Sequence, residues 1–173
     1  MSSECTLYRD VNFSGAQLTL RREMSELKQQ GFNDAASSAK IMGTPWIFYK
    51  DTSFMGTSYI VKPGSYPNPS TWGGDNDTLS SLRPLPSETE GDRGVIALFE
   101  HTNYGGRMVV LTTSTPDFTK LNFNDRVSSL IVIKGSWTVF RDVNYRVDIG
   151  TYTAGAQIST VAPNDTMSSI RLN

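Results

Sequence analysis

A short polar motif, Asn-Asp-x-x-Ser-Ser, occurs four times in the chain and carries residue types suited to holding a hard cation. The copies are loop 1 (33–38), loop 2 (76–81), loop 3 (124–129) and loop 4 (164–169). Calcium takes about 6–8 oxygen ligands from carboxylates, hydroxyls, carbonyls and water. Each motif offers a carboxylate at its second position, a hydroxyl at its fifth, and a turn that can aim a carbonyl inward. One loop has too few ligands, so two loops must meet to complete a site.

The same motif also suits a plain turn, because Asn, Asp and Ser side chains bond to nearby backbone. In that alternative, the Asp and Ser side chains bond backbone amides and stabilise the turn without an ion. A purely structural loop, however, does not require an acidic second position in every copy. The motif therefore favours calcium binding and leaves a structural role as the alternative.

A second motif precedes each loop and indicates the element that positions it. It consists of an aromatic residue, four residues, a second aromatic residue, one residue, and usually a glycine. Its copies are Tyr8, Phe13 and Gly15; Tyr49, Phe54 and Gly56; Phe99, Tyr104 and Gly106; and Phe140, Tyr145 and Val147. We interpret the motif as a strand entering a tight hairpin, where glycine supplies a positive φ. Val147 breaks the rule and predicts a strained or rebuilt hairpin, with Gly150 as a candidate substitute.

The rest of the chain predicts an all-β fold of two similar halves. Short segments rich in β-branched and aromatic residues alternate with turn residues, and helix is limited to about one turn at 24–30 and at 115–121. Four strands per repeat give two Greek keys per domain, packed as an antiparallel sandwich. Prolines, charges and glycine interrupt the pattern at 84–94. We therefore expect domains at 1–86 and 94–173, joined by a linker at 87–93.

Composition argues against several other classes of protein. The 173 residues have a formal net charge of −1, so no basic surface favours nucleic acid, and no segment is apolar enough to span a membrane. The N-terminus shows no apolar signal region, which predicts a cytoplasmic protein, and we expect a monomer. Cys5, the only cysteine, lies near a terminus expected to be mobile and cannot form an intramolecular disulfide. With His101 the only histidine, we expect neither an enzyme nor a zinc site.

Together, the two motifs resemble the βγ-crystallin family over nearly the whole chain. The segment VKPGSYPNPSTWGGDNDTLSSLR (61–83) is similar to the closing motif of such a domain, with Tyr66 as a corner tyrosine and Trp72 as a core tryptophan. The resemblance implies two βγ-crystallin-like domains, each a β-sandwich of two Greek-key motifs related by a pseudo-twofold axis. The family includes lens proteins and single-domain calcium-binding members.

The resemblance also implies a reciprocal arrangement of calcium ligands, in which each loop gives its Asp to the ion held by its partner loop. The implied ligands are the carbonyls of Arg9 and Ala35, the Ser37 hydroxyl and the Asp77 carboxylate at site 1; the carbonyls of Lys50 and Thr78, Ser80 and Asp34 at site 2; the carbonyls of Glu100 and Arg126, Ser128 and Asp165 at site 3; and the carbonyls of Arg141 and Thr166, Ser168 and Asp125 at site 4. One side-chain charge per ion predicts a Kd of roughly 10⁻⁶ to 10⁻⁴ M. The cation of Arg126 predicts that site 3 is the weakest.

We thus expect a non-enzymatic calcium-binding βγ-crystallin with up to four calcium ions. The alternative is a structural crystallin-type protein of high solubility in which calcium binding is weak or vestigial. A carbohydrate-binding or pore-associated module would require an exposed aromatic groove, for which the sequence gives no sign.

Overall fold

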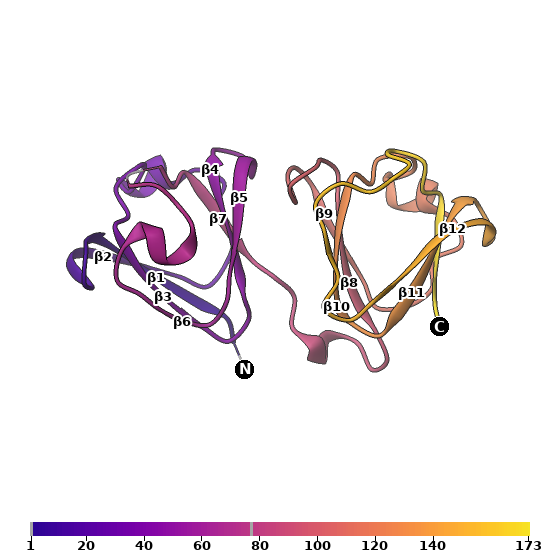
Figure 1. Cartoon of the computed structure of the whole chain (residues 1–173), viewed down its shortest axis with the longest axis horizontal. Helices are drawn as coiled ribbons and strands as arrows, with labels where there is room; N and C mark the ends of the chain where they lie inside the picture. The colour runs from indigo at the N-terminus through magenta and orange to yellow at the C-terminus, as the bar shows by residue number, and fades with distance from the viewer. Residues whose placement is uncertain (1, 77) are drawn as a thin grey trace. The chain divides into compact units, whose positions relative to one another are not determined.

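Short segments rich in β-branched and aromatic residues form the strands of this chain. The computed structural model describes residues 2–76 and 78–173, which form an all-β structure with four antiparallel sheets. The chain separates into two units, Met1–Leu85 and Pro86–Asn173 (Figure 1). Each unit holds one four-stranded and one three-stranded sheet. The expected β-sandwich of two Greek keys per domain is confirmed.

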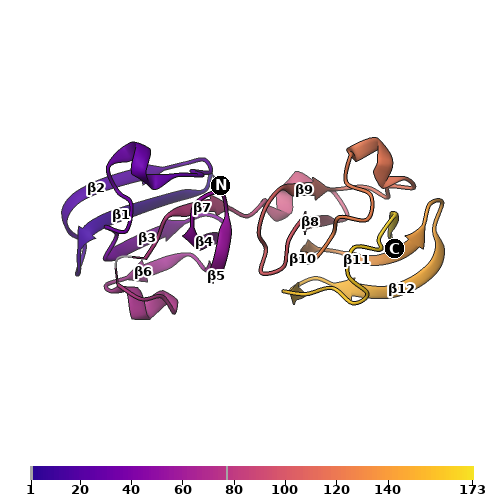
Figure 2. The ribbon, with the colours of Figure 1, turned by 90° about the horizontal axis from the view of Figure 1, so that it is seen from above.

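The described residues of the first unit form seven strands. They are β1 (Glu4–Asp10), β2 (Ser14–Leu20), β3 (Ser38–Met42), β4 (Trp46–Asp51), β5 (Met55–Val61), β6 (Gly64–Tyr66) and β7 (Ser81–Pro84). One sheet has the order β2-β1-β3-β6 and the other β5-β4-β7. Figure 2 shows these two sheets on opposite sides of the unit.

The second unit repeats this plan. Its strands are β8 (Val95–Phe99), β9 (Met108–Leu111), β10 (Ser129–Lys134), β11 (Ser136–Asp142), β12 (Arg146–Thr153), β13 (Gln157–Ile158) and β14 (Ser169–Leu172). The sheet orders are β13-β10-β8-β9 and β12-β11-β14. Each of the four repeats thus begins with a hairpin and ends with a strand that pairs beside it.

The two repeats of a unit exchange one strand. In the first unit, β6 of the second repeat pairs with β3 of the first, and in return Met24 forms an isolated bridge with Leu82 of β7. In the second unit, β13 pairs with β10, and Thr115 bridges Ile170. The expected four strands per repeat are therefore found in the second and fourth repeats, while in the first and third the exchanged strand is reduced to a single bridge.

Short 3₁₀ helices connect the strands. They are η1 (Leu27–Gln30), η2 (Pro69–Trp72), η3 (Glu88–Glu90) and η4 (Phe118–Leu121). Both predicted single turns are present as η1 and η4. The sequence did not predict η2 or η3.

Each unit has its own apolar core between its two sheets. Trp46 and Phe48 of β4 meet Leu7 of β1 in the first core, and Trp137 lies in the second. Trp46 and Trp137 are the largest fully buried side chains of the two cores. Cys5 is also fully buried in β1, so the prediction that it lies on a mobile terminus was wrong. Pairing of β1 with both β2 and β3 orders that end of the chain, and burial raises the pKa of the thiol.

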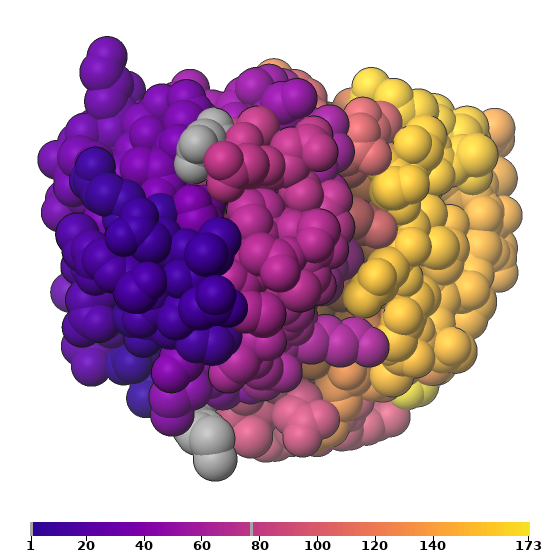
Figure 3. Space-filling model, turned by 60° about the vertical axis from the view of Figure 1, so that its left-hand side comes forward, coloured from indigo at the N-terminus to yellow at the C-terminus, as the bar shows by residue number. Residues whose placement is uncertain are grey.

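The closing motif of the first unit has the predicted features. The Tyr66 hydroxyl donates to the carbonyl of Lys62 at 2.6 Å, and Trp72 packs edge-on against Phe48 with ring centroids 5.5 Å apart. The Asn12 amide of the first hairpin donates to the carbonyl of Pro67 at 2.8 Å. In Figure 3 the earliest residues, in indigo, accordingly lie against the magenta surface of this closing segment.

Candidate metal centre

The aromatic motif forms the same turn in all four repeats. Its two aromatic rings meet edge-on with centroids 5.6–5.8 Å apart, and the second aromatic has a left-handed backbone. Val147 has φ +61°, close to the φ +80° of its counterpart Gly56. The hairpin is therefore retained and Val147 occupies the strained conformation, because Tyr145 keeps its left-handed φ and its ring contact.

The strand that enters each hairpin anchors the loop of the same repeat. The amide of each fifth-position serine donates to the carbonyl of the first aromatic, one residue before a predicted carbonyl ligand. The pairs are Ser37 and Tyr8 at 2.8 Å, Ser80 and Tyr49 at 3.0 Å, Ser128 and Phe99 at 2.9 Å, and Ser168 and Phe140 at 3.0 Å. This bond ties each serine to the chain just before Arg9, Lys50, Glu100 or Arg141, the residues predicted to supply carbonyls, and at Glu100 the Ser128 hydroxyl reaches that carbonyl.

Hydroxyl and carboxylate groups meet across the two loops of a unit. Ser80 Oγ lies 3.1 Å from Asp34 Oδ1, although the two residues belong to different repeats. Ser168 Oγ lies 3.3 Å from Asp125 Oδ1. The structure thus brings together the serine and the aspartate predicted for site 2 and for site 4.

Site 3 joins three of its predicted residues around one hydroxyl. Ser128 Oγ lies 2.8 Å from the carbonyl oxygen of Glu100 and 2.8 Å from Asp165 Oδ1. The serine is 4% exposed, whereas Asp165 is exposed to solvent, so these oxygens meet at the edge of the protein interior. A carbonyl from the strand, a hydroxyl from one loop and a carboxylate from the other therefore converge.

Site 1 is described only in part, because Asp77 lies outside the described residues. Ser37 Oγ lies 3.4 Å from Oδ1 of Asn76, the residue before Asp77. The hydroxyl of site 1 thus faces loop 2, as the reciprocal arrangement predicts.

The backbone of the loops aims the carboxylates. Asp34, Asp125 and Asp165 have φ of 49°, 51° and 52°, a left-handed conformation that Asp adopts more readily than most residues. Their amides bond the partner loop: Asp34 to the carbonyl of Leu79, Asp125 to that of Met167 and Asp165 to that of Val127.

The first residue of the motif orients the second. The side-chain amides of Asn33, Asn124 and Asn164 donate to Oδ2 of the following aspartate at 2.7, 2.6 and 3.2 Å. These bonds leave Oδ1 of each aspartate for the opposite loop. The first-position asparagine therefore positions the aspartate, a role that the sequence did not predict.

The sixth-position serine also has a role that the sequence reading missed. In the first repeat, Ser38 Oγ donates to the carbonyl of Asp10 at 2.6 Å and accepts from the amide of Phe13 at 2.9 Å. Ser81, Ser129 and Ser169 make the equivalent pair of bonds in their own repeats. All four serines are fully buried. They fasten the hairpin to the loop, and the fixed spacing of the two motifs was the signal that could have revealed this.

The four third-position residues, Ala35, Thr78, Arg126 and Thr166, differ in chemistry. Thr78 and Thr166 bond back to the carbonyls of Asp75 and Pro163, both at 3.1 Å. Arg126 instead forms an ion pair with Glu100, with Nη1 and Oε1 3.2 Å apart. The positive charge of Arg126, which was expected to disfavour calcium at site 3, is thus paired with the carboxylate of Glu100.

The donor set limits what the loops can bind. Within the described part of the chain, His, Cys, Asp and Glu form no group of three or more that could hold a metal. A cation would have to rely on carbonyl and hydroxyl oxygens with one carboxylate, a set that suits calcium and not zinc.

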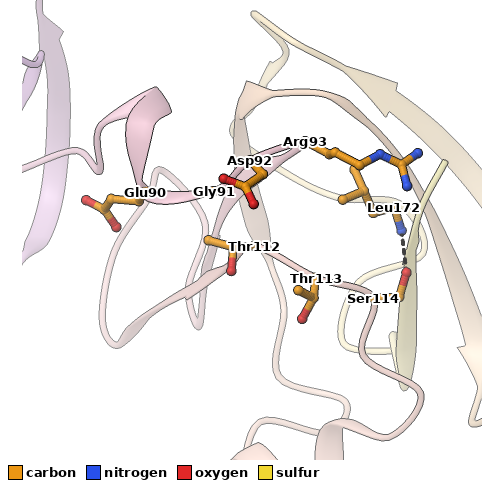
Figure 4. A pocket seen from close by; sticks show the side chains of 8 residues that line it. All are labelled: Glu90, Gly91, Asp92, Arg93, Thr112, Thr113, Ser114 and Leu172. Carbon is orange, nitrogen blue, oxygen red and sulfur yellow. Dashed lines mark hydrogen bonds between the residues drawn. The ribbon is translucent and has the colours of Figure 1, made fainter.

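A pocket of the second unit lies away from the loops. It measures about 450 Å³ and is lined by Glu90, Gly91, Asp92, Arg93, Thr112, Thr113, Ser114 and Leu172 (Figure 4). The amide of Leu172 donates to Ser114 Oγ at 2.9 Å along one wall. No aromatic residue is among the lining residues, so this pocket is not the aromatic groove that a carbohydrate-binding module would require.

A family model described as Beta/Gamma crystallin matches residues 4–85 and 95–172. The chain belongs to the βγ-crystallin family. This βγ-crystallin is 44% identical over 77 residues to a beta/gamma-crystallin of Ciona intestinalis, an alignment that covers 44% of the chain and 92% of the relative. It is 25% identical over 170 residues to gamma-crystallin N-A of Danio rerio, with 94% and 92% coverage.

Two further comparisons bear on its extent and fold. The βγ-crystallin is 34% identical to the epidermal differentiation-specific protein of Cynops pyrrhogaster over 78% of the chain, but the match covers only 38% of that relative. Geodin, a βγ-crystallin from Geodia cydonium, superposes over the full length of both chains with a TM-score of 0.74 at 17% identity, which shows the shared fold.

The family confirms the expectation that the chain is not an enzyme, because crystallins are structural proteins. His101 lies exposed in a bend of the third hairpin, where its carbonyl accepts from Ser129 Oγ. Helices long and apolar enough to cross a membrane are absent from residues 2–76 and 78–173.

Proposed function

We propose that this βγ-crystallin binds calcium ions at the paired loops, and that the ions stabilise its fold. The observation that carries the proposal is the convergence at site 3. The Ser128 hydroxyl has one hydrogen, yet it lies 2.8 Å from both the Glu100 carbonyl oxygen and the Asp165 carboxylate. One hydrogen cannot fully satisfy two acceptors, so oxygen lone pairs remain for a cation.

The same donor set supports the other sites to different degrees. Sites 2 and 4 each pair a buried serine with a carboxylate of the partner loop, at 3.1 and 3.3 Å. When calcium is bound, Asp34 and Asp125 would supply the charge there, and strand and loop carbonyls would supply neutral oxygens. The loops are already held by backbone bonds, so binding should tie down side chains without assembling the fold.

A calcium titration of the full chain by calorimetry tests the proposal. We expect up to four ions with a Kd on the order of 10⁻⁶ to 10⁻⁴ M, because each ion receives one carboxylate. Far-ultraviolet circular dichroism should stay unchanged on chelation. No heat at millimolar calcium would reject calcium binding.

Substitutions in the first unit test the reciprocal assignment. Asp34→Ala should remove site 2, the site of Ser80, and leave site 1 measurable. Adding Ser80→Ala should change the stoichiometry little further, because both changes affect one ion. Adding Asp77→Ala instead should remove both sites of the unit.

The matched control is Asp92→Ala, which removes an exposed carboxylate outside the loops. It should leave all binding steps in place. Loss of both first-unit sites in Asp34→Ala alone would contradict the crossed assignment even if the protein bound calcium.

A structural role without calcium is the second candidate, and one observation favours it. The hydroxyls of Ser80, Ser128 and Ser168 already bond a loop aspartate of the partner repeat, which joins the two loops of each unit without an ion. Under this alternative, the thermal unfolding temperature would be the same in calcium and in chelator.

A further inference from the structure

Site 3 differs from the other three sites in the sign of two side chains. The strand residue that supplies a carbonyl is basic at Arg9, Lys50 and Arg141 but acidic at Glu100. The third residue of the loop is uncharged at Ala35, Thr78 and Thr166 but cationic at Arg126. In the third repeat the positive charge is therefore on the loop, at Arg126, and the position that is basic in the other repeats carries a carboxylate, Glu100.

The Glu100 side chain is held at the edge of site 3. Its Oε1 pairs with Nη1 of Arg126 at 3.2 Å, and its Oε2 accepts from the backbone amide of Arg107 at 3.4 Å. The carbonyl of the same residue already touches the Ser128 hydroxyl at 2.8 Å. Glu100 is 27% exposed on its side chain and Arg126 58%, so the arginine is the partner with freedom to move.

A second arginine explains why an acid is tolerated at this strand position. In the first repeat, Arg9 stacks on the Phe32 ring, with the guanidinium carbon 5.3 Å from the centroid, and donates to the carbonyl of Gly31. In the third repeat, Arg107 of the hairpin stacks on Phe123 at the same distance and donates to the carbonyls of Leu121 and Asn122. Arg107 therefore replaces the packing role of Arg9 and leaves Glu100 available for another role.

We propose that the Glu100 carboxylate is an additional anionic group of site 3 and that Arg126 is its built-in counter-ion, which a divalent cation displaces. This inference rests on the proposed function and concerns the control of one of its sites. An exposed ion pair is weak, so a divalent ion can break it, but the nearby guanidinium lowers the apparent affinity. Once displaced, Arg126 leaves two carboxylates, Glu100 and Asp165, for the bound ion.

The test isolates site 3 in the full chain. The background carries Asp34→Ala, Asp77→Ala and Asp125→Ala, which leaves Asp165 as the only loop aspartate. In this background, Arg126→Thr installs the residue found at positions 78 and 166 and should tighten calcium binding by about tenfold. Glu100→Gln, which keeps the carbonyl and removes the charge, should weaken it by a similar factor.

The control is Arg146→Thr, which removes an exposed arginine of the same unit that lies outside the proposed ligands. It should change the Kd by less than about twofold. Arg126→Thr should lose most of its benefit in the presence of Glu100→Gln, because the freed carboxylate is what the ion gains. If the chain with the three aspartate substitutions binds calcium too weakly to measure, Arg126→Thr and Arg146→Thr are compared in the otherwise unmodified chain, from its stepwise binding constants.

The outcomes separate this inference from the proposed function. If the unmodified chain gives no heat with calcium, the proposed function fails. If the unmodified chain binds calcium but Arg126→Thr behaves like Arg146→Thr, the function stands and this inference is wrong. A calcium-bound structure with the Glu100–Arg126 pair intact would also overturn it.

Discussion

The two units of this βγ-crystallin share the bonds that position the loops and differ in what surrounds them. In every repeat a sixth-position serine fastens the hairpin to the loop, and the aromatic pair keeps its geometry. The first unit adds η2 and the corner tyrosine Tyr66, while the corresponding part of the second unit has only the two-residue strand β13. The second unit instead contains the Glu100–Arg126 pair and the strained Val147.

This comparison separates two tasks of the sequence. The serines and aromatics build the scaffold that any ion would require, so a change there should affect both units alike. The closing segment and the charges near the loops are local, so a change there should affect one unit only. Five measurements test this distinction.

The largest effect should come from the closing segment of the first unit. Trp72→Ala removes a ring that is 8% exposed and packed on Phe48, and should lower the stability of the first unit by about 3–5 kcal/mol. Denaturant unfolding followed by residue-resolved hydrogen exchange should show the second unit unchanged. An equal loss in both units would mean that they unfold as one, and would break the comparison.

Calcium should stabilise the first unit more than the second. One site adds about 2.7 kcal/mol at a hundredfold excess of calcium over Kd. Calcium should raise the melting temperature of the unmodified chain. Asp34→Ala/Asp77→Ala should lose more of this calcium-induced rise than Asp125→Ala/Asp165→Ala, because Arg126 disfavours an ion in the second unit. Equal or reversed losses would show that Arg126 does not weaken calcium binding in the second unit.

The sixth-position serines should matter equally in the two units. Ser38→Ala and Ser129→Ala each remove a buried hydroxyl and its two hydrogen bonds to an amide and a carbonyl of the hairpin, at a cost of about 1–3 kcal/mol. Chemical denaturation measures this, with the exposed Ser159→Ala as a control expected near zero. A large difference between the two buried sites would contradict a shared scaffold.

Alkaline pH should weaken the first unit through Tyr49. Burial raises the pKa of Tyr49 to about 12, and Arg83 Nε donates to its hydroxyl at 3.0 Å. Because the unfolded tyrosine titrates near 10, the unfolded state loses its proton first as the pH rises. Stability is therefore kept below pH 10 and falls by about 1.4 kcal/mol per unit between pH 10 and 12.

Tyr49→Phe should flatten this slope in an unfolding series from pH 9 to 12. The counterparts Phe99 and Phe140 have no hydroxyl, while partial burial raises the pKa of Tyr104 and Tyr152 in the second unit. Tyr104 and Tyr152 should therefore weaken the second unit over this range as well, and Tyr49→Phe should change the slope of the first unit only. An unchanged slope in the variant would assign the alkaline loss to other groups.

The smallest effect should come from the glycine position of the hairpins. Val147→Gly relieves a left-handed φ of 61° and should stabilise the second unit by about 1 kcal/mol. Gly56→Ala should destabilise the first by about 1–2 kcal/mol, since a Cβ there would lie 2.4 Å from Asp51 Oδ2. Thermal unfolding measures both, with Val11→Gly as a control that relieves no strain.

The sequence alone determined the repeats, the hairpins and the two-unit all-β fold. Aromatic spacing, turn residues and strand propensity act locally, so Phe13 or Gly56 can be read from their neighbours. The closing segment was also readable, because Tyr66 and Trp72 stand at a recognisable spacing from loop 2. The reduction of the exchanged strand to a Met24–Leu82 bridge was not readable, since it depends on pairing between repeats.

The details of the candidate site were decided only by the tertiary structure. The sequence placed Ser80 and Asp34 in one site by resemblance, but their 3.1 Å contact exists because two repeats pack around a common core. The Glu100–Arg126 pair was not readable from the sequence, and the partners of the sixth-position serines were only hinted at by the fixed spacing of the two motifs. Each joins atoms separated by about 24–30 positions in the chain, and only the folded backbone brings such atoms within hydrogen-bonding distance.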